Sequence, residues 1–420
     1  MRTCAVFSYK GREIDPRIAG RELGVQAVFT GKLVSWGERL FLSTELVNAA
    51  DGVRLWGQQY ERPLSGIIAL QTDLARQISD HLRLRLTGEQ QRQLARHHTE
   101  NPEAHRLYPK GRHNLGSYNE KQFKEALNAF KQALDLDPTY APAFVGISDS
   151  YYSLSNLFLP PNEAMPKSRS AAQKALELDE TLAEAHTSLG IVKSVSDWDW
   201  AGAEHEFKRA LEINPGSAPA HHAYGLLLVY TDRGEEALIE FKRARDLDPL
   251  SASIATTSLQ PFVYASPSTR RPDLAIEGAK RILAIETKFS PAYLILGLAY
   301  LEKGMGPEAC APMEKARQEN SSTIFAGYLA NCYGMTGKHA EAKTLLEELQ
   351  RRSKAEHASA LSMASAHAGL DDREKAFSWL EKAYINRDEE LVFLHGDPQF
   401  DKLRSDPRFI DLLRRLGLSR

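Results

Sequence analysis

The chain has 420 residues, room for roughly two to four domains at about 150 residues each. Hydrophobic residues make up 42% and charged residues 26%, which is ordinary for globular proteins and excludes disorder throughout. Lys and Arg total 53 and Asp and Glu total 55, so the formal net charge is −2. This balance provides no electrostatic attraction to nucleic acid or anionic lipid, and we expect neither as a partner.

No apolar run reaches the roughly 18 residues of a membrane-spanning helix, and the N-terminus lacks a signal-peptide pattern. As encoded, the chain is therefore expected to be soluble and cytoplasmic, without membrane insertion. As part of a longer parent protein, it would instead be membrane-tethered or extracytoplasmic. Cys4, Cys310 and Cys332 are too few for a disulfide framework and suit a reducing compartment. We expect Cys310 and Cys332 to act as small buried hydrophobic residues.

Residues 1–100 have the pattern of a small α+β domain with a three-stranded antiparallel meander. The expected elements, in chain order, are a strand at Thr3–Tyr9, a helix from Asp15-Pro16 to Leu23, strands at Val25–Ser35, Arg39–Asn48 and Val53–Tyr60, and an amphipathic helix from Ser65 to Leu86. Residues 36–38 form an expected turn, and Asp51-Gly52 is a strong hairpin signal. The second strand alternates with period two, which places Leu40, Leu42, Thr44 and Leu46 on one face.

This region resembles the TolB-amino-terminal-like, or FlgO-like, domain through the GRELG sequence at 20–24, the hairpin, Leu55-Trp56 and the long helix. The resemblance implies a module of bacterial multidomain signalling proteins, in which a Ser/Thr kinase, a nucleotide cyclase or a winged-helix DNA-binding domain commonly lies upstream. The family domain begins with a further strand and helix. We therefore expect a truncated domain with an open sheet edge, which would favour homo-oligomers.

Residues 101–387 repeat a pattern of paired helices. The segments EALNAFKQALDLDP (125–138), GAEHEFKRALEINP (202–215) and EALIEFKRARDLDP (236–249) share a small Ala, an aromatic residue four positions later, a second Ala three after that and an Asp/Asn-Pro end. Positions i, i+4 and i+7 lie on one helix face, so the Ala admits a neighbouring helix and the Phe fills the adjoining space. The first Ala recurs at Ala126, Ala203, Ala237, Ala275, Ala309, Ala342 and Ala376.

The repeat resembles the tetratricopeptide repeat (TPR). Tyr293, Leu296, Gly297 and Tyr300 match the signature of its first helix, and Ala309, Met313 and Ala316 match its second helix. We therefore predict a mostly α fold: an α-solenoid of about eight TPR helix-turn-helix units over 101–387, preceded by the small α+β domain at 1–100. Asp-Pro pairs at 397–398 and 406–407 are typical of the first residues of a helix, and they predict C-terminal capping helices within 388–420.

No motif of an enzyme is found. A phosphate loop, a nucleophile elbow and the kinase motifs are all missing from the sequence, so we expect no catalytic residue and no cofactor. His186 and His221 hold equivalent positions in adjacent first helices, but further metal ligands are not indicated, which favours hydrogen bonding over a metal. In Asp197-Trp-Asp-Trp200 we expect an Asp to cap the next helix, in preference to a recognition loop.

The remaining candidate site is the inner face of the solenoid, which first helices line in TPR proteins. Carrying those positions over by the resemblance gives Val145, Asp149, Tyr152, Thr187, Ile191, His222, Leu226, Val229, Leu294, Leu298, Leu301 and Asn331. The Lys and Asn residues that clamp a carboxylate in chaperone-tail binders are mostly lacking, so the expected partner is an apolar or amphipathic protein segment. Residues 226–230 and 294–301 are apolar nearly all round and must be covered on both sides. The cover is either the chain's own superhelix or a dimer mate, or it is a partner segment.

These observations predict a non-enzymatic protein-interaction scaffold. The alternative is the regulatory or sensor part of a bacterial signalling protein whose effector domain lies outside this chain. A homo-oligomeric structural scaffold is a third hypothesis.

Overall fold

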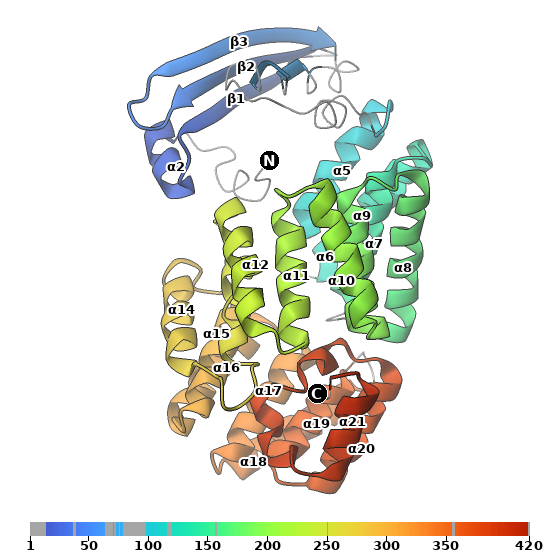
Figure 1. Ribbon diagram of the computed structural model, residues 1–420, viewed down its shortest axis with the longest axis vertical. Coiled ribbons are helices and arrows are strands. Elements are labelled where there is room, and N and C mark those ends of the chain that lie inside the picture. The colour runs from blue at the N-terminus through green and yellow to red at the C-terminus, as the bar shows by residue number, and fades with distance from the viewer. Residues whose placement is uncertain are drawn as a thin grey trace.

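The computed structural model describes residues 14–36, 39–63, 70, 73–74, 76–78, 98–115, 120–155, 158–249, 251–354 and 358–418. A small sheet lies beyond one end of a helical solenoid (Figure 1). The strand expected at 3–9, residues 37–38 of the expected turn and most of the helix expected at 65–86 fall outside the described residues. None of the described helices combines the length and apolarity needed to cross a membrane.

The N-terminal region contains helix α2 (Pro16–Leu23) and an antiparallel sheet of β1 (Ala27–Trp36), β2 (Arg39–Asn48) and β3 (Arg54–Pro63), in that spatial order. Asp15 caps α2 by accepting a hydrogen bond from the Arg17 N–H at 2.8 Å. Gly24 ends the helix at a φ of 61°, a conformation that glycine adopts without strain. The predicted helix and three-stranded meander are confirmed.

Helix pairs make up the rest of the described chain down to residue 386. The pairs are α5 (Pro102–Leu115) with α6 (Glu120–Leu136), α7 (Ala141–Ser155) with α8 (Pro161–Leu178), α9 (Ala183–Val192) with α10 (Trp200–Ile213), α11 (Ala218–Tyr230) with α12 (Gly234–Leu247), α13 (Ala252–Thr257) with α14 (Pro272–Ile285), α15 (Ser290–Glu302) with α16 (Gly306–Glu319), α17 (Thr323–Met335) with α18 (His339–Arg352), and α19 (Ala360–Gly369) with α20 (Arg373–Asn386). A π-helix, η2 (Lys193–Asp197), extends α9, and a 3-10 turn, η3 (Gln260–Phe262), follows α13. This arrangement confirms the predicted α-solenoid.

The repeated small residues hold each pair together. Every Ala of the repeating first position, from Ala126 to Ala376, is 0% exposed. On the facing helix of the fourth pair, a Cβ added to Gly225 would lie 2.8 Å from the Phe241 ring. The helices of a pair therefore approach until the aromatic ring lies on bare backbone, which explains the spacing of Ala and Phe in the sequence.

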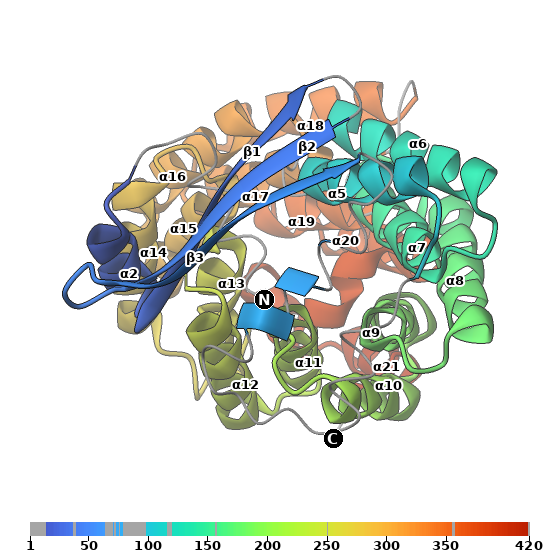
Figure 2. The ribbon, with the colours of Figure 1, turned by 90° about the horizontal axis from the view of Figure 1, so that it is seen from above.

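The solenoid closes on itself. Seen from above, its helices form a ring, with first helices on the inner side (Figure 2). After α20, the 3-10 helices η4 (Glu389–Phe393) and η5 (Pro398–Leu403) and helix α21 (Pro407–Arg415) turn back into the ring. Trp200 donates its indole N–H to the carbonyl of Leu416 at 2.9 Å, and one apolar cluster joins Val195 to Leu391. The chain end therefore joins the last repeat to the third and fourth.

The apolar helix α15 is covered from within the chain. Leu298 is fully buried, and Phe393 of η4 packs against the same cluster. The sequence left open whether the apolar first helices are covered by the chain itself, a dimer mate or a partner segment. For α15, the chain's own superhelix covers the helix. The helix cap predicted in the turn 197–200 is confirmed, since Asp199 caps α10 by accepting a hydrogen bond from the Gly202 N–H at 2.9 Å.

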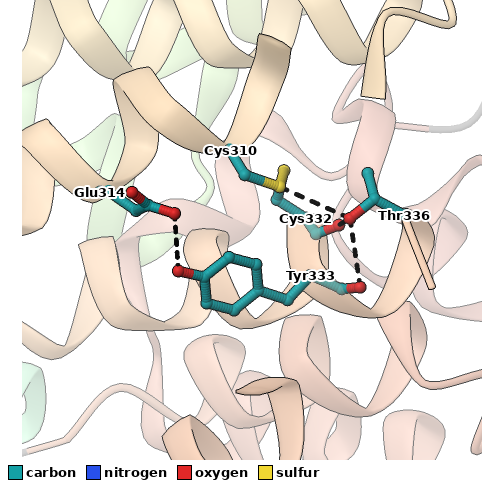
Figure 3. The surroundings of a disulfide bond; sticks show 5 residues. All are labelled: Cys310, Glu314, Cys332, Tyr333 and Thr336. Atoms are coloured by element: carbon teal, nitrogen blue, oxygen red, sulfur yellow. Dashed lines mark hydrogen bonds between the residues drawn. A yellow bond between two sulfur atoms is a disulfide. The ribbon is translucent and has the colours of Figure 1, made fainter. Parts of the chain in front are cut away.

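The interpretation of the cysteines needs correction. Cys310 and Cys332 are buried, as expected, but they form a disulfide between α16 and α17, with their Cα atoms 5.8 Å apart (Figure 3). The two residues are 22 positions apart in sequence, and only the antiparallel packing of the two helices brings them together. Disulfides are typical of oxidising compartments, so the cysteine content no longer supports a reducing one.

Candidate binding groove

The first helices α5, α7, α9 and α11 line a pocket of about 260 Å³ on the concave face. Consecutive first helices lie side by side there, so residues one repeat apart face the same space. The lining residues are Arg112, Leu115, Asp149, Tyr152, Ser153, Glu184, Thr187, Ser188, Ile191, Ser194, Val195, Phe207, Ser217, Pro219, His222, Ala223, Leu226 and Tyr230. We call this pocket the concave groove.

Polar side chains link the first helices at one end of the concave groove. Arg112 of α5 forms an ion pair with Asp149 of α7 at 2.5 Å, and Ser188 of α9 donates to the same carboxylate at 2.7 Å. Asp149 thus ties three successive repeats together. The Asp149 charge is matched by Arg112, and Glu184, which also acts on Arg112, adds a second carboxylate to this end of the groove.

Apolar side chains form the middle of the groove. Ile191 of α9 and Leu226 of α11 are half-buried and contact the main core from its open side. Val195 and Tyr230 lie one helical turn further along the same two helices and extend the apolar strip. An apolar side chain of a partner would find contacts here, because the floor is not fully covered by the chain itself.

His222 borders the groove in its neutral form. Burial lowers the pKa of His222 to about 4, and its Nε2 lies 2.7 Å from the Thr257 hydroxyl of α13. The imidazole therefore carries no charge near neutral pH and serves as a hydrogen-bonding group between α11 and α13. Among the lining residues, Glu184 is an exposed carboxylate at the rim.

The structure divides the predicted site residues into two sets. Six lie together in the concave groove, namely Asp149, Tyr152, Thr187, Ile191, His222 and Leu226. The others are packed into the protein: Val145, Val229, Leu298 and Asn331 are buried, and Leu294 and Leu301 are half-buried against the main core. Asn331, for instance, donates to the Ser365 carbonyl of α19 at 2.9 Å. These six residues do not line the groove.

Several groove residues were missed from the sequence. Arg112 belongs to the first repeat, whose inner positions were not projected, although it occupies the position that faces Asp149 one repeat later. Val195 and Tyr230 follow Ile191 and Leu226 at i+4, a spacing that would have identified them. Ser194 of η2 also lines the groove, and nothing in the repeat pattern signals a π-helix at that point.

The two equivalent histidines share one arrangement. Nδ1 of His186 lies 2.7 Å from Glu206, and Nδ1 of His221 lies 2.5 Å from Glu240, so each first helix is tied to its own second helix. Among the described residues, no group of three His, Cys, Asp or Glu side chains is arranged to hold a metal ion. The hydrogen-bonding role predicted for His186 and His221 is confirmed.

Comparison with known families supports the reading of the solenoid. A sequence model described as tetratricopeptide repeat matches residues 117–140. The match spans part of the first helix pair, and its second helix α6 carries the Ala and Phe spacing that recurs in later pairs.

Curated relatives match only in part. The chain is 30% identical over 193 residues to a putative adenylate cyclase 3 of Rhizobium meliloti (strain 1021), which covers 45% of this chain and 32% of that protein. It is 27% identical over 154 residues to the transcriptional regulator HilA of Salmonella typhimurium, covering 36% of this chain and 28% of HilA. This chain thus matches about a third or less of the length of either relative.

Solved structures show a distant likeness. YrrB, described as a TPR protein with an unusual peptide-binding site, has a TM-score of 0.31 and 20% identity, covering 46% of this chain and 94% of YrrB. The Cut9–Hcn1 hetero-tetramer of APC/C has a TM-score of 0.48 and 14% identity, covering 70% of this chain and 52% of that chain.

Proposed function

We propose that this chain is a non-enzymatic interaction scaffold that binds an apolar or amphipathic protein segment in the concave groove. The observation that carries the proposal is the uncovered apolar strip of Ile191 and Leu226, framed by the Arg112–Asp149 ion pair. A segment lying in the groove would bury its apolar side chains on the strip and place polar groups against the framing residues. The ring would hold the first helices rigid, so little ordering free energy would be lost on binding.

The proposal is tested with peptides selected from a displayed library on the wild-type protein. Ile191→Asp places a carboxylate in the floor of the groove and is expected to weaken binding by at least about tenfold, because a charge must then be desolvated. Ile239→Asp is the matched control, since Ile239 is 54% exposed on the second helix α12. Fluorescence anisotropy measures affinity, and circular dichroism checks that both variants stay folded. Peptides that bind the Ile191→Asp protein as tightly as wild type would contradict the proposal.

A second candidate is the regulatory part of a larger bacterial signalling protein. The partial matches to a putative adenylate cyclase and to a transcriptional regulator support it, because those are two of the effector types that the FlgO-like resemblance of residues 1–100 implies. Sequencing the DNA upstream of the Met1 codon tests it: an open frame encoding a cyclase, kinase or winged-helix domain is expected. An in-frame stop close upstream would count against this candidate.

The disulfide bears on where the protein works. Cys310–Cys332 favours the extracytoplasmic location over the cytoplasmic one, since thiols in the cytosol are kept reduced. Homo-oligomer formation through the sheet also stays a proposal. It is supported by β1, an edge strand among the strands that the structure describes, on which Leu33, Val34 and Trp36 are exposed.

A further inference from the structure

Residues 388–404, between α20 and α21, lie against the inner side of the ring, and we call them the closing segment. Within it, η4 contacts η2 and α11, while η5 contacts α15 and α19. The Phe393 ring lies 4.9 Å from the ring of Tyr230 and 4.6 Å from that of Tyr264. The closing segment thus holds the last repeat against repeats three to six.

This contact surface carries carboxylates that lack a cationic partner. Asp388, Glu389 and Asp397 are at most 5% exposed, and Glu390 is half-buried beside them. The ion pairs among the described residues include none of these four side chains. Buried carboxylates without a cation are costly to ionise, so their charge state affects how well the segment stays docked.

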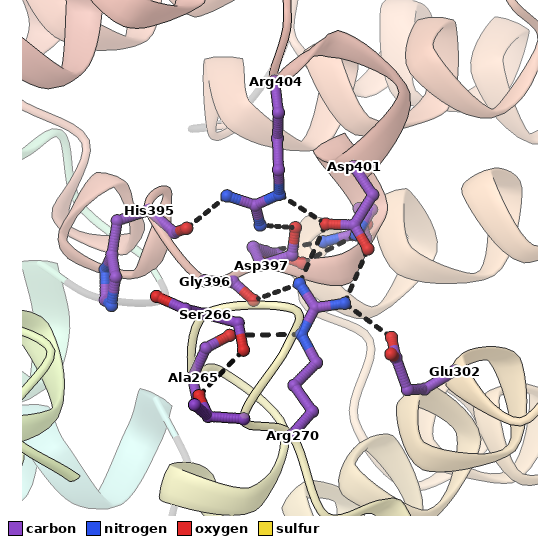
Figure 4. A network of polar contacts seen from close by, with 11 residues as sticks. Ala265, Ser266, Arg270, Glu302, His395, Gly396, Asp397, Asp401 and Arg404 are labelled. Atoms are coloured by element: carbon purple, nitrogen blue, oxygen red, sulfur yellow. Dashed lines mark hydrogen bonds and ion pairs between the residues drawn. The ribbon is translucent and has the colours of Figure 1, made fainter.

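Arg404 of the closing segment and Arg270 beside it are engaged by other groups. Arg270 bonds Glu302 at 2.5 Å, Asp401 at 2.6 Å and the Gly396 carbonyl at 2.9 Å (Figure 4). Arg404 bonds Asp401 at 2.6 Å and the carbonyl groups of His395 and Asp397. Both guanidinium groups therefore bind backbone carbonyl groups and Asp401. Neither forms a direct ion pair with the other carboxylates of the closing segment.

The groups facing these carboxylates from each neighbouring element are mostly neutral. Tyrosine hydroxyls approach from α11, the loop after η3 and α17, and Tyr328 donates to Asp397 at 3.3 Å. The N-terminus of α19 supplies the Ser359 hydroxyl and the Leu361 N–H to Asp388. Ser155, at the end of α7, faces Glu389.

Charged neighbours are few, and those of η2 are already paired. In η2, Lys193 bonds Glu206 at 2.6 Å, and Asp197 bonds Arg169. Lys382 of α20 acts on Asp388 only through longer-range attraction, and His395 lies 4.0 Å from Asp232. Nothing among these groups offsets ionisation of the Glu389–Glu390 pair.

We propose that the closing segment is a pH-sensitive latch, which holds the ring shut while the buried carboxylates are protonated and loosens as they ionise. Opening would release η4 and η5 from the inner side of the ring and uncover the apolar faces of α11, α15 and α17 that they cover. The latch does not depend on what binds the concave groove. It couples the shape of the solenoid to the pH of its compartment.

The sign of the effect follows from burial. Burial raises the pKa of Glu389 to about 8 and that of Asp397 to about 6, and it raises the pKa of Glu390 as well. A carboxyl group whose pKa is higher in the docked state than in the undocked state stabilises docking. This contribution is fully present at pH values below the undocked pKa. That contribution is lost as the pH rises toward the docked pKa. The docked state should therefore weaken between acidic pH and about pH 8.

Hydrogen–deuterium exchange of peptides from the closing segment in the full chain tests this at about pH 6 and about pH 8, which correspond to the pKa values of Asp397 and Glu389. After correction for intrinsic exchange rates, protection in the wild type is expected to fall by about tenfold or more over this range, because one proton lost on opening gives about tenfold per pH unit. The double variant Glu389→Gln with Glu390→Gln keeps the shape and cannot ionise. It should stay protected at both pH values.

The matched control is Glu235→Gln with Glu236→Gln, a consecutive pair on α12 whose side chains are exposed. It removes the same charge and should keep the wild-type pH dependence. Equal corrected protection at both pH values in the wild type would overturn the latch. A double variant of Glu389 and Glu390 whose protection depends on pH as strongly as in the wild type would also overturn the latch. If that double variant fails to fold, the pH dependence of the wild type and of the control still decides, and Glu389→Gln alone is the second variant, expected to reduce that dependence.

Discussion

The guanidinium of Arg270 bonds both carboxylate oxygens of Asp401, a residue 131 positions further along the chain. The Arg270 side chain is 1% exposed, while the carboxylates of Asp401 and Glu302 remain partly open to solvent. Arg270 lies in the irregular loop of the fifth repeat, which reaches into the ring to meet the closing segment. The repeat pattern is therefore irregular at the point where the fifth repeat binds the closing segment.

Arg270→Met should lower the free energy of unfolding by about 3 kcal/mol, the low end for breaking a buried ion pair, because its acidic partners can regain water. Chemical denaturation measures this change. The neighbouring variant Arg271→Met removes an exposed ion pair to Glu235 and should cost less than about 1 kcal/mol. Equal losses of unfolding free energy in the two variants would show that the buried Arg270 contacts do not stabilise the docking of the closing segment.

Leu298 and Leu226 should respond differently to truncation, although both were predicted as groove residues. Leu298→Ala leaves a cavity in the core and should cost about 2–5 kcal/mol in the free energy of unfolding. Leu226→Ala removes a half-buried side chain and should cost about 1 kcal/mol, while weakening peptide binding. Thermal denaturation and anisotropy measure the two effects. Normal stability of the Leu298→Ala protein would place this residue outside the core.

Gly225→Ala should destabilise the fourth repeat, because the new Cβ would lie 2.8 Å from the Phe241 ring. Overpacking of this kind costs about 1–3 kcal/mol, measured as a lower midpoint of chemical denaturation. Gly216→Ala is the control, since the nearest atom to its added Cβ is 3.5 Å away in an exposed turn. A Gly225→Ala protein as stable as this control would show that the helix pair can spread apart without penalty.

The disulfide predicts a simple thiol count. Alkylation of the unfolded chain without a reductant should modify one cysteine, Cys4, and alkylation after reduction should modify all three. Replacing both Cys310 and Cys332 by Ala should lower the free energy of unfolding by about 2–4 kcal/mol. Intact-mass spectrometry reads the count. Three reactive thiols without reductant, in protein kept from reducing conditions, would exclude the bond.

Local patterns in the sequence were enough to predict the paired helices, the three strands and the cap at Asp15. These features depend on residues close together in the chain: the Ala and Phe at i and i+4, the alternation in β2 and the turn at Asp51-Gly52. Of the inner positions carried over from the TPR resemblance, six line the concave groove, since first helices present equivalent positions at each repeat. Packing that depends on neighbouring turns is therefore predictable from spacing alone.

Tertiary structure alone decided which inner positions remain open and which are buried. Leu226 and Leu298 occupy comparable first-helix positions, but the chain end returns over α15 and leaves part of α11 uncovered. The same return brings Arg270 to Asp401, and helix packing brings Cys310 to Cys332. A repeat pattern specifies how each unit meets the next. It does not specify how small rotations between units add up around the ring, and that sum determines where the end of the chain docks.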